Sequence, residues 1–494
     1  MASLNASQEK TPDHCRIASH SQSAGFNERT LSAMSPSVDV QEKLVRPAAE
    51  QLQIVIVGAG LGGLGAAIGL LLAGHKVHIL EAASKIAEVG AGIQILPNSS
   101  RVLRRWGLED RLVPKATCPA TVHMLDWKGN EMSRMDFFTA MREYESPFWD
   151  FHRADLHQAL LERAFELGAT IQVNSRVEDV RCGEHTATVI LKNEQTLTAD
   201  LVVGADGIFS KCRDILVGKH DPPIATGDLA YRVLLKTDRM KRDPELARSL
   251  EKPHRVRYWL GPDAHAVNYP LRHGELCNLV LLVPDDMPAE ATTLDGNVEE
   301  MRAWYRDWDP QITKMLAFCE SVQKWKLCYR PGLDRPWSHS SGTFTLLGDS
   351  VHATLPYLAS GAGMCLEDAM TLGLCFRKVG SSARDKRLAL AVYEQCRRAR
   401  TVNIVERGNL QQVLYHLHDG KERDERDERF RTFAKLDLEI QQGLRDPRSD
   451  LPSGLSAGDD PFAWRRFGVG AWLLGFDCES DLERQWPSIL ESKF

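Results

Sequence analysis

The stretch LQIVIVGAGLGGLGAAIGLLLAGHKVHILEA, residues 52–82, predicts a strand, a glycine turn, a helix and a second strand. Its three glycines form G-x-G-x-x-G directly after the first strand. Gly58 permits a tight turn, Gly60 lets the backbone approach a pyrophosphate at the helix N-terminus, and Gly63 lets helix and strand pack closely. The stretch therefore predicts a dinucleotide-binding unit.

An acidic residue completes this unit. Glu81 ends the second strand, 23 residues after Gly58, where its carboxylate can accept the two hydroxyls of an adenosine ribose. A lone G-x-G-x-x-G is a weak signal and can be a turn that binds nothing. Both strands, the helix and Glu81 in register favour dinucleotide binding.

The composition is that of an ordinary globular enzyme. The 494 residues are 43% hydrophobic and 26% charged, and the net charge of −6 favours neither nucleic acid nor an anionic membrane. The eleven cysteines are odd in number and never form C-x-x-C. They favour free thiols in a reducing compartment over disulfides, and we expect no metal site.

The ends of the chain bear on localisation. Residues 1–49 are rich in Ser, Asn, Gln and Ala, and we expect a disordered tail. No stretch reaches 18 uncharged apolar residues, so we expect no transmembrane anchor and a cytoplasmic protein. The chain ends Ser492-Lys493-Phe494, one residue away from a peroxisomal S-K-L address, a match that chance explains at least as well.

Two further segments repeat the sequence of strand, turn and helix. GADGIFSKCR, residues 204–213, places Asp206 and Gly207 at such a junction, although an Asp-Gly turn is also a common helix cap. LLGDSVHATLPYLASGAG, residues 346–363, offers a second helix N-terminus to an anionic or polar ligand group. Arg153, at the start of an amphipathic helix, can reach back towards phosphates or simply be solvated.

The remaining segments define the predicted organisation. Residues 120–140 predict a hairpin turning at residues 128–130, and alternating runs after residue 227 predict a mixed or antiparallel sheet. A long helix is expected over 384–417, with Arg398 and Arg400 on its exposed side. The predicted parts are the tail (1–49), a dinucleotide-binding domain (50–226), a sheet domain (227–340), a return segment (341–380) and a C-terminal region (381–494).

In their order and separation, the three motifs resemble the class A flavoprotein monooxygenases, from about Leu52 to His418. The HDG sequence at 418–420 is similar to fungal salicylate-hydroxylase-like members. The resemblance implies an α/β fold: a Rossmann-like FAD-binding domain like that of p-hydroxybenzoate hydroxylase, an inserted mixed β-sheet substrate domain and a helical C-terminal part.

The resemblance also implies non-covalent FAD and NADH or NADPH as a transient co-substrate, since no second G-x-G-x-x-G in a βαβ context exists. Reduced flavin would react with O₂ to give a C4a-hydroperoxide that oxidises a phenolic or other aromatic small molecule, in secondary metabolism or aromatic catabolism. Relatives often have Gln where this chain has Ser360. The implied cofactor-binding residues are Gly58, Gly60, Gly63, Glu81, Gly92, Gln94, Arg153, Asp206, Gly207, Asp349, Gly361, Ala362 and Gly363.

Two residues match catalytic positions of fungal phenol-oxidising and dearomatising hydroxylases. Arg232 would favour the phenolate, and Tyr269 would position it. Lowering a phenolic pKa from about 10 to neutrality takes on the order of 3 to 4 kcal/mol, which one partly desolvated arginine can supply. Otherwise Arg232 is an exposed strand charge and Tyr269 a core tyrosine. Tyr231 and Tyr258 are further candidates for an aromatic wall.

The motifs bind flavin rather than substrate, so they leave alternatives open. An FAD-dependent epoxidase or indole oxygenase of secondary metabolism would carry the same motifs, and Arg232 would then serve substrate rearrangement. A non-enzymatic flavin-binding sensor is a more remote alternative. The sequence does not distinguish hydroxylation, dearomatisation and epoxidation, nor NADH from NADPH.

Overall fold

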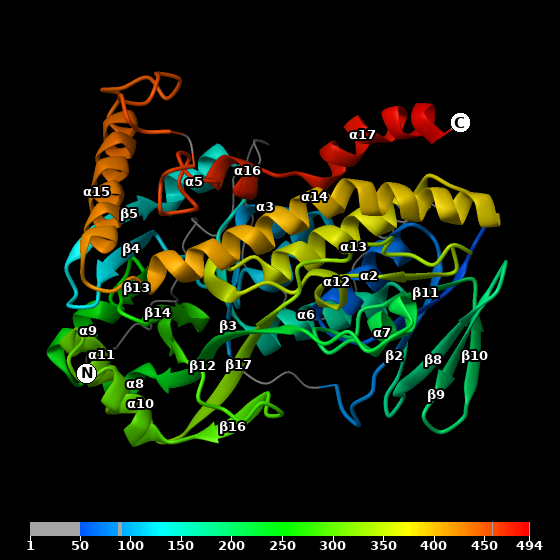
Figure 1. The fold of residues 1–494 in the computed structure, drawn as a ribbon, viewed down its shortest axis with the longest axis horizontal. Helices are drawn as coiled ribbons and strands as arrows, with labels where there is room; N and C mark the ends of the chain where they lie inside the picture. Colours follow the sequence, from blue (N-terminus) through cyan, green and yellow to red (C-terminus); the bar gives the residue numbers. More distant parts are fainter. Residues whose placement is uncertain (1–49, 87–90, 457, 494) are drawn as a thin grey trace, which may run out of the picture.

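A computed structural model describes residues 50–86, 91–456 and 458–493, and for 489–493 only the course of the helix (Figure 1). The expected tail, residues 1–49, and Phe494 of the proposed peroxisomal address lie outside these residues. No helix within the described ranges is long and apolar enough to cross a membrane.

A five-stranded sheet carries the glycine motif. Each neighbouring pair of its strands is parallel. Its central strands are buried on both faces, as parallel sheets require. The strand order is β18 (Phe344–Leu346), β11 (Leu201–Gly204), β1 (Gln53–Val57), β2 (Lys76–Leu80) and β7 (Thr170–Gln172).

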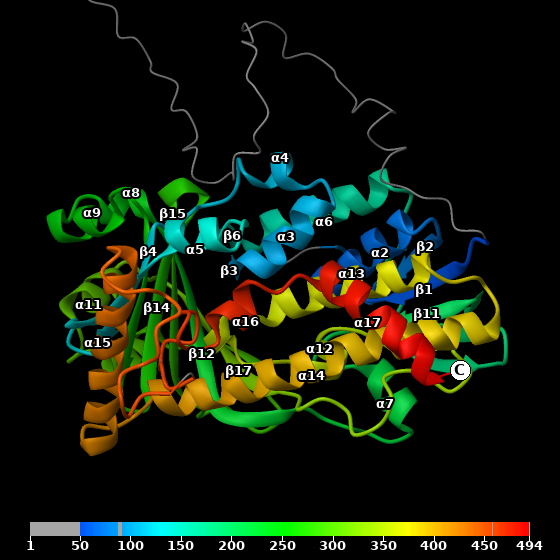
Figure 2. The same ribbon diagram turned by 90° about the horizontal axis from the view of Figure 1, so that it is seen from above.

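Three long helices lie side by side beyond this sheet. In both views α13 (Gly361–Arg377) lies between α2 (Leu61–Leu72) and α14 (Ala383–Tyr415) (Figures 1 and 2). A Cβ on Gly69 would come within 2.6 Å of Ala369 O, and one on Gly373 within 2.5 Å of Gly69. The close approach of α2 and α13 therefore depends on these glycines.

An eight-stranded mixed sheet forms the second part of the molecule. Only β13 and β4 pair in parallel; the other neighbours are antiparallel. The predicted hairpin is confirmed as β4 and β5, which join this sheet although they precede it in the chain. The order is β16 (Thr293–Gly296), β17 (Val322–Tyr329), β12 (Ile224–Lys236), β15 (Leu276–Pro284), β14 (Ala264–Leu271), β13 (Arg255–Gly261), β4 (Thr121–Asp126) and β5 (Glu131–Asp136).

The two faces of this sheet pack against different partners. One face forms a core with short helices, and the other packs towards α13, α14 and the segment around Trp464. Figure 2 shows the sheet at one end of the molecule and the three long helices running away from it. The short helices are α8 (Thr237–Met240), α9 (Pro244–Leu250), α10 (Val298–Trp304) and α11 (Pro310–Leu316).

Two smaller sheets complete the strand arrangement. A two-stranded ribbon pairs β3 (Gly92–Ile95) with β6 (Trp149–His152). A three-stranded sheet stands at the opposite end of the molecule from the eight-stranded one (Figure 1). Its strands are β8 (Val177–Cys182), β9 (Ala187–Leu191) and β10 (Thr196–Ala199). The remaining helices are α3 (Pro97–Arg105), α4 (Glu109–Leu112), α5 (Phe137–Glu143), α6 (Arg153–Glu166), α7 (Lys211–Val217), α12 (Asp349–His352), α15 (Lys421–Gln441), α16 (Gly470–Leu474) and α17 (Cys478–Lys493).

The long helix is confirmed, but one expectation about its faces is wrong. Arg400 is buried rather than exposed, because its guanidinium forms an ion pair with Glu367 of α13 at 2.8 Å. Arg397, one turn earlier, pairs with both Glu367 and Asp368. Two buried carboxylates on α13 thus require cations from α14.

Candidate functional site

Four strands of the parallel sheet carry predicted residues at one edge. Gly58 follows β1, Glu81 follows β2, Asp206 follows β11 and Asp349 follows β18. Because these strands are parallel, their carboxyl ends meet at the same edge. In doubly wound sheets this is the edge at which ligands bind.

The glycine turn leaves the start of α2 open. Gly58 has φ +105°, and a Cβ there would lie 2.5 Å from Ala205 O. A Cβ on Gly63 would lie 1.9 Å from Gly58 O, whereas one on Gly60 would meet nothing within 4 Å. No side chain caps this helix, and its first turn contains no acid. The helix start therefore presents free space and a positive dipole end to an anion.

Glu81 is held at this turn by the backbone. Its Oε2 accepts a hydrogen bond from Ala59 N (2.9 Å), and its Oε1 accepts one from Ala83 N (2.7 Å). The carboxylate is thus fixed beside the glycine turn. Each carboxylate oxygen can accept a further bond.

A second helix starts at the same edge. The contacts of Gly62 with Cys365 and of Gly65 with Ala369 advance together along both helices, so α2 and α13 run parallel. At the start of α13, Gly361 and Ala362 are half-buried, and no side chain caps the helix. Ser360 turns its hydroxyl inward to Leu358 O (2.9 Å). Two helix N-termini therefore face the same region.

Asp206 braces the next motif. Its carboxylate accepts hydrogen bonds from the Ser210 hydroxyl and from Cys212 N, and so caps α7. Arg213 of α7 then donates to the carbonyl oxygens of Ser350 (3.3 Å) and Val351 (2.8 Å) in α12. The structural cap foreseen for the Asp-Gly turn is real, and it connects the segment of Asp206 to that of Asp349.

Asp349 lies within electrostatic range of two basic side chains. Its side chain is exposed to solvent on one side. The protein atoms around it still desolvate the carboxyl and raise its pKa. The charges of His352 and Arg153 oppose that rise. Arg153 is placed here by its own backbone, since its N–H donates to Ala91 O (2.8 Å).

A buried ionic cluster holds the start of α12. Asp368 Oδ2 lies 2.7 Å from His352 Nε2 and accepts from Gly348 N (3.1 Å). Its other oxygen accepts from Arg397 Nε (2.8 Å). Burial raises the pKa of Asp368, but the charges of His352 and Arg397 outweigh it and hold that pKa below its usual value. Packing of His352 within the fold, rather than base chemistry, is what these contacts favour.

The second sheet presents Arg232, Tyr258 and Tyr269 on one face. Strand register aligns Arg232 with Val280, which pairs with Val267 beside Tyr269. The Arg232 guanidinium carbon lies 4.4 Å from the ring centroid of Trp325. Burial strongly raises the pKa of Tyr269, the negative charge of Asp150 adds to the rise, and the positive charge of Arg232 opposes it.

Tyr231 cannot belong to the same wall. Successive strand residues point to opposite faces, and Tyr231 packs in the core beneath the short helices. Its hydroxyl donates to Glu300. The interpretation of Tyr231 as a wall residue is therefore wrong, whereas Tyr258 lies on the face of Arg232.

Gly92 joins the two halves of the predicted site. Its N–H donates to Asn278 Oδ1 (2.9 Å) across a sequence separation of 186 residues. A Cβ at Gly92 would lie 2.6 Å from Asn278 Cγ, 2.6 Å from Tyr269 Cε2 and 2.7 Å from Tyr269 Oη. The expected flavin-lining strand thus lies directly against the expected catalytic tyrosine.

A polar chain runs behind this contact. Tyr258 Oη donates to Gln94 Oε1 (3.3 Å), and Gln94 Nε2 donates to Asp150 Oδ1 (3.0 Å). Asp150 is fully buried, and burial holds the pKa of its carboxyl well above the usual value, with the Gln94 hydrogen bond opposing. Burial therefore opposes ionisation of the Asp150 carboxyl.

Known proteins match this arrangement over most of the chain. Residues 51–408 match the family described as FAD binding domain. The FAD-dependent monooxygenase OpS4 of Beauveria bassiana is 41% identical over 396 residues, which is 79% of this chain and 91% of that protein. The 3-hydroxybenzoate 6-hydroxylase of Klebsiella oxytoca is 32% identical over 400 residues, 80% of this chain and 96% of that one. The chain belongs to the FAD-dependent aromatic monooxygenases.

Solved structures agree on the fold of this monooxygenase. A salicylate hydroxylase in complex with its substrate superposes with a TM-score of 0.68 at 21% identity, covering 88% of this chain and 97% of that one. The expected α/β class, with its Rossmann-like sheet, mixed sheet and C-terminal helices, is confirmed.

The residues at the sheet edge suit FAD. The open start of α2 fits a pyrophosphate, and the carboxylate of Glu81 beside it fits a ribose. The half-buried start of α13 gives a second place for polar atoms of an extended cofactor. The monooxygenase thus has an open helix start for the pyrophosphate and a carboxylate for the ribose.

Sequence reasoning missed Asn278 and Asp150. Asn278 is the one amide in the otherwise apolar strand LCNLVLLVP, residues 276–284. A lone polar residue in a buried strand is a signal that could have identified it. Asp150 gave a weaker signal, because nothing in WDFH shows that its carboxyl is fully buried.

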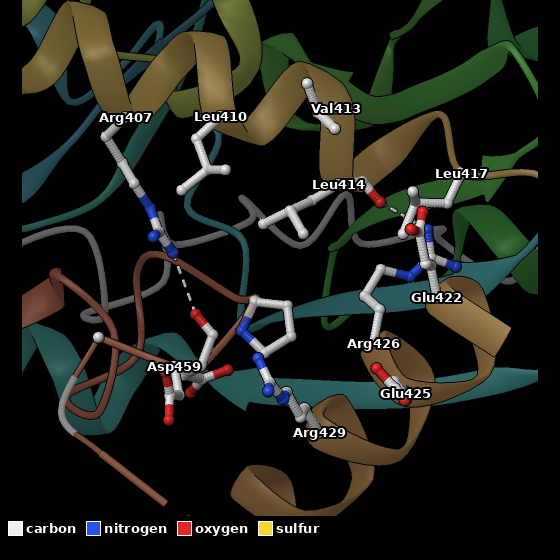
Figure 3. Close-up of a pocket in the computed structure, with 13 residues that line it drawn as sticks. Arg407, Leu410, Val413, Leu414, Leu417, Glu422, Glu425, Arg426, Arg429 and Asp459 are labelled. Carbon is white, nitrogen blue, oxygen red and sulfur yellow. Dashed lines mark hydrogen bonds between the residues drawn. The ribbon is translucent and has the colours of Figure 1, made fainter.

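A pocket elsewhere contains none of the predicted residues. It has a volume of about 370 Å³ and lies among the end of α14, the start of α15 and residues 458–461 (Figure 3). Two arginines that line this pocket form hydrogen bonds with backbone carbonyl oxygens (Figure 3). Arg407 donates to Asp460 O (3.1 Å), and Arg426 donates to Leu414 O (2.6 Å). This charged surface pocket lies away from the sheet edge that carries the cofactor residues.

Proposed function

We propose that this monooxygenase inserts one oxygen atom of O₂ into a phenolic or other aromatic small molecule, at the face of the second sheet that carries Arg232 and Tyr269, beside Gly92. NAD(P)H supplies the electrons, and the second oxygen atom leaves as water. The observation that supports this most is the contact of Gly92 with Tyr269 and Asn278, since it brings a cofactor-lining strand against substrate-side residues.

FAD, when bound, supplies the oxygen-activating chemistry. We assign its pyrophosphate to Gly58, Gly60 and Gly63, and its ribose to Glu81. The other residues of the assignment lie at the same edge or beside the Gly92 contact: Gly92, Gln94, Arg153, Asp206, Gly207, Asp349, Gly361, Ala362 and Gly363.

Arg232 and Tyr269 take different parts in substrate activation. The stacking of Arg232 on Trp325 holds its charge at the sheet face, where that charge stabilises a phenolate over the neutral phenol. Tyr269 keeps its proton because burial raises its pKa. Its hydroxyl can therefore donate a hydrogen bond to the phenolate oxygen and orient the ring carbon that is oxidised.

An aromatic shell keeps this face dry. The ring centroids of Tyr258 and Tyr415 lie 6.0 Å apart, those of Tyr258 and Trp464 6.1 Å apart, and those of Tyr357 and Tyr415 6.3 Å apart. All four side chains are buried. Exclusion of water favours oxygen transfer over loss of peroxide.

The test follows NADH and NADPH oxidation and O₂ uptake by the purified yellow protein with a panel of phenols and indoles. We expect a phenol to stimulate both and to yield a product one oxygen heavier. Arg232→Ala should lower kcat/KM by about 100-fold, the loss of roughly 3 kcal/mol of phenolate stabilisation, while FAD content is kept.

Arg239→Ala is the matched control, because Arg239 forms only an exposed pair with Glu320. Stimulation by indoles or alkenes alone would replace the phenol proposal with the epoxidase or indole oxygenase alternative. An FAD-loaded protein whose NAD(P)H oxidation is not stimulated by any of the aromatic compounds would contradict both proposals.

A further inference from the structure

Asn278 lies at the centre of the contact between the two halves of the site. It is 1% exposed and pairs with Tyr269 across β15 and β14. Its Oδ1 accepts the hydrogen bond from Gly92 N. An N–H needs an acceptor, so this bond fixes which end of the amide is oxygen and leaves the Nδ2 group pointing elsewhere.

The Nδ2 group of Asn278 has no hydrogen-bond partner among the residues that the structure describes. A buried amide donor without a partner costs about 1–3 kcal/mol. The neighbouring amide shows the usual solution: Asn268 Nδ2, on the other face of the sheet, donates to Asn278 O (3.0 Å) and Cys277 Sγ (2.8 Å). The unsatisfied donor is therefore a feature of the face that carries Arg232 and Tyr269.

Other buried atoms also lack partners, so an unsatisfied donor alone does not define a site. Trp106 Nε1 and Trp149 Nε1 belong to the core of the parallel sheet. Asn278 differs from these because it touches Gly92, and the hydroxyl of Tyr269 lies against that same glycine. A donor at this position is therefore available to a molecule bound beside this contact.

We propose that Asn278 is a further ligand-binding residue, whose Nδ2 group donates a hydrogen bond to an acceptor oxygen of a molecule bound beside the contact of Gly92 with Tyr269. The proposal rests on the proposed function for its location. The acceptor is a carbonyl or phenolic oxygen, and it belongs either to the aromatic substrate or to the dioxo ring of the flavin.

Asn278→Asp is the sharpest variant. Aspartate has the same shape and keeps an oxygen for Gly92 N, but replaces the NH₂ donor with a second acceptor. Asn278→Ala removes both groups and keeps the test decisive if the aspartate variant does not fold. FAD dissociation constants and the visible flavin spectrum are measured without substrate. The dissociation constant of a phenol that stimulates the wild type is then measured from its perturbation of that spectrum.

The two sources of the acceptor give different results. If the substrate supplies it, the dissociation constant of the phenol rises about tenfold in Asn278→Asp at pH 8, while FAD affinity and spectrum stay as in the wild type. If the flavin supplies it, FAD affinity falls about tenfold or the flavin bands shift without substrate. Wild-type FAD affinity, flavin spectrum and phenol affinity in both variants would overturn the proposal.

Failure of the proposed function is recognisable separately. A wild-type protein that no phenol stimulates would refute the assignment of a phenolic substrate, and the FAD measurements would still decide the flavin arm for Asn278. Ser249→Ala serves as the control variant, and its FAD and phenol affinities should equal those of the wild type. The Ser249 hydroxyl donates to Leu246 O within α9, which packs against the opposite face of the eight-stranded sheet.

Discussion

The two faces of the eight-stranded sheet are similarly aromatic but differ in the hydrogen bonding of their polar atoms. Beneath the short helices, Tyr305 Oη donates to two carbonyl oxygens at 3.1 Å, and Trp259 Nε1 donates to Asp309 (2.7 Å). On the side of Arg232, Asn278 Nδ2 and Asp150 Oδ2 lack partners within the described part of the chain. The first face is a completed core, whereas the second leaves buried polar atoms unsatisfied, which supports the proposal that it binds a ligand.

The largest contrast is expected from two glycines. Gly92→Ala places a methyl group 2.6 Å from Tyr269 and Asn278, and should lower kcat/KM by about 100-fold through displacement of both side chains. Gly261→Ala places one 2.8 Å from Trp308 on the other face, and should cost about 1–3 kcal/mol of stability with little kinetic effect. Steady-state kinetics and thermal melting of both variants measure the contrast, and equal kinetic losses would remove it.

A smaller contrast is expected from two tyrosines. Tyr269→Phe should lower kcat/KM for the phenol by about 10-fold to 100-fold without a change in melting temperature, because the lost hydroxyl serves the substrate. Tyr231→Phe loses the bond to Glu300 and should reduce stability by about 1 kcal/mol while kinetics stay within about twofold. A Tyr269→Phe enzyme as active as the wild type would leave Tyr269 as a core residue.

A further contrast concerns Asp150 and depends on pH. Its folded pKa is raised above the unfolded value, so its contribution to stability is fully present below about pH 4 and is lost as pH rises towards the folded pKa. Asp150→Asn should therefore gain stability relative to the wild type by about 1.4 kcal/mol per pH unit in that window.

Melting temperatures of FAD-saturated wild type and Asp150→Asn at pH 5, 6.5 and 8 test this. A difference that does not change with pH would show that Asp150 does not stay protonated on folding. Asp309→Asn, on the completed face, should simply lower stability, because the two Asp309 oxygens accept from Trp259 and Gln311 N.

Local patterns predicted residues that the structure brings to one edge of the parallel sheet. The glycines, Glu81, Asp206 and Asp349 each follow a strand, and the parallel pairing of those strands brings them to one edge. The prediction for Tyr231 was wrong because successive residues of a strand point to opposite faces, so Tyr231 and Arg232 cannot share one. Arg400 was misjudged for another reason: its partner Glu367 lies 33 residues away on a different helix.

The contact between β3 and the eight-stranded sheet could not be predicted from local sequence patterns. Nothing in the residues around Gly92 indicates that Asn278, 186 positions later, accepts its N–H. That contact depends on how the second sheet docks against β3, which only the folded chain defines. The roles of Arg232 and Tyr269 stay predictions until the variants are measured.

The glycine contacts between α2 and α13 fix the distance between the N-terminal ends of these two helices. The two helices pack closely, because Gly69 and Gly373 leave no room for a side chain between them. Two positive helix ends are therefore held at one fixed separation. A mononucleotide engages only one end, whereas a molecule long enough to reach both gains the second contact at high effective concentration. This arrangement would favour a cofactor that reaches both helix ends over one that reaches only one of them.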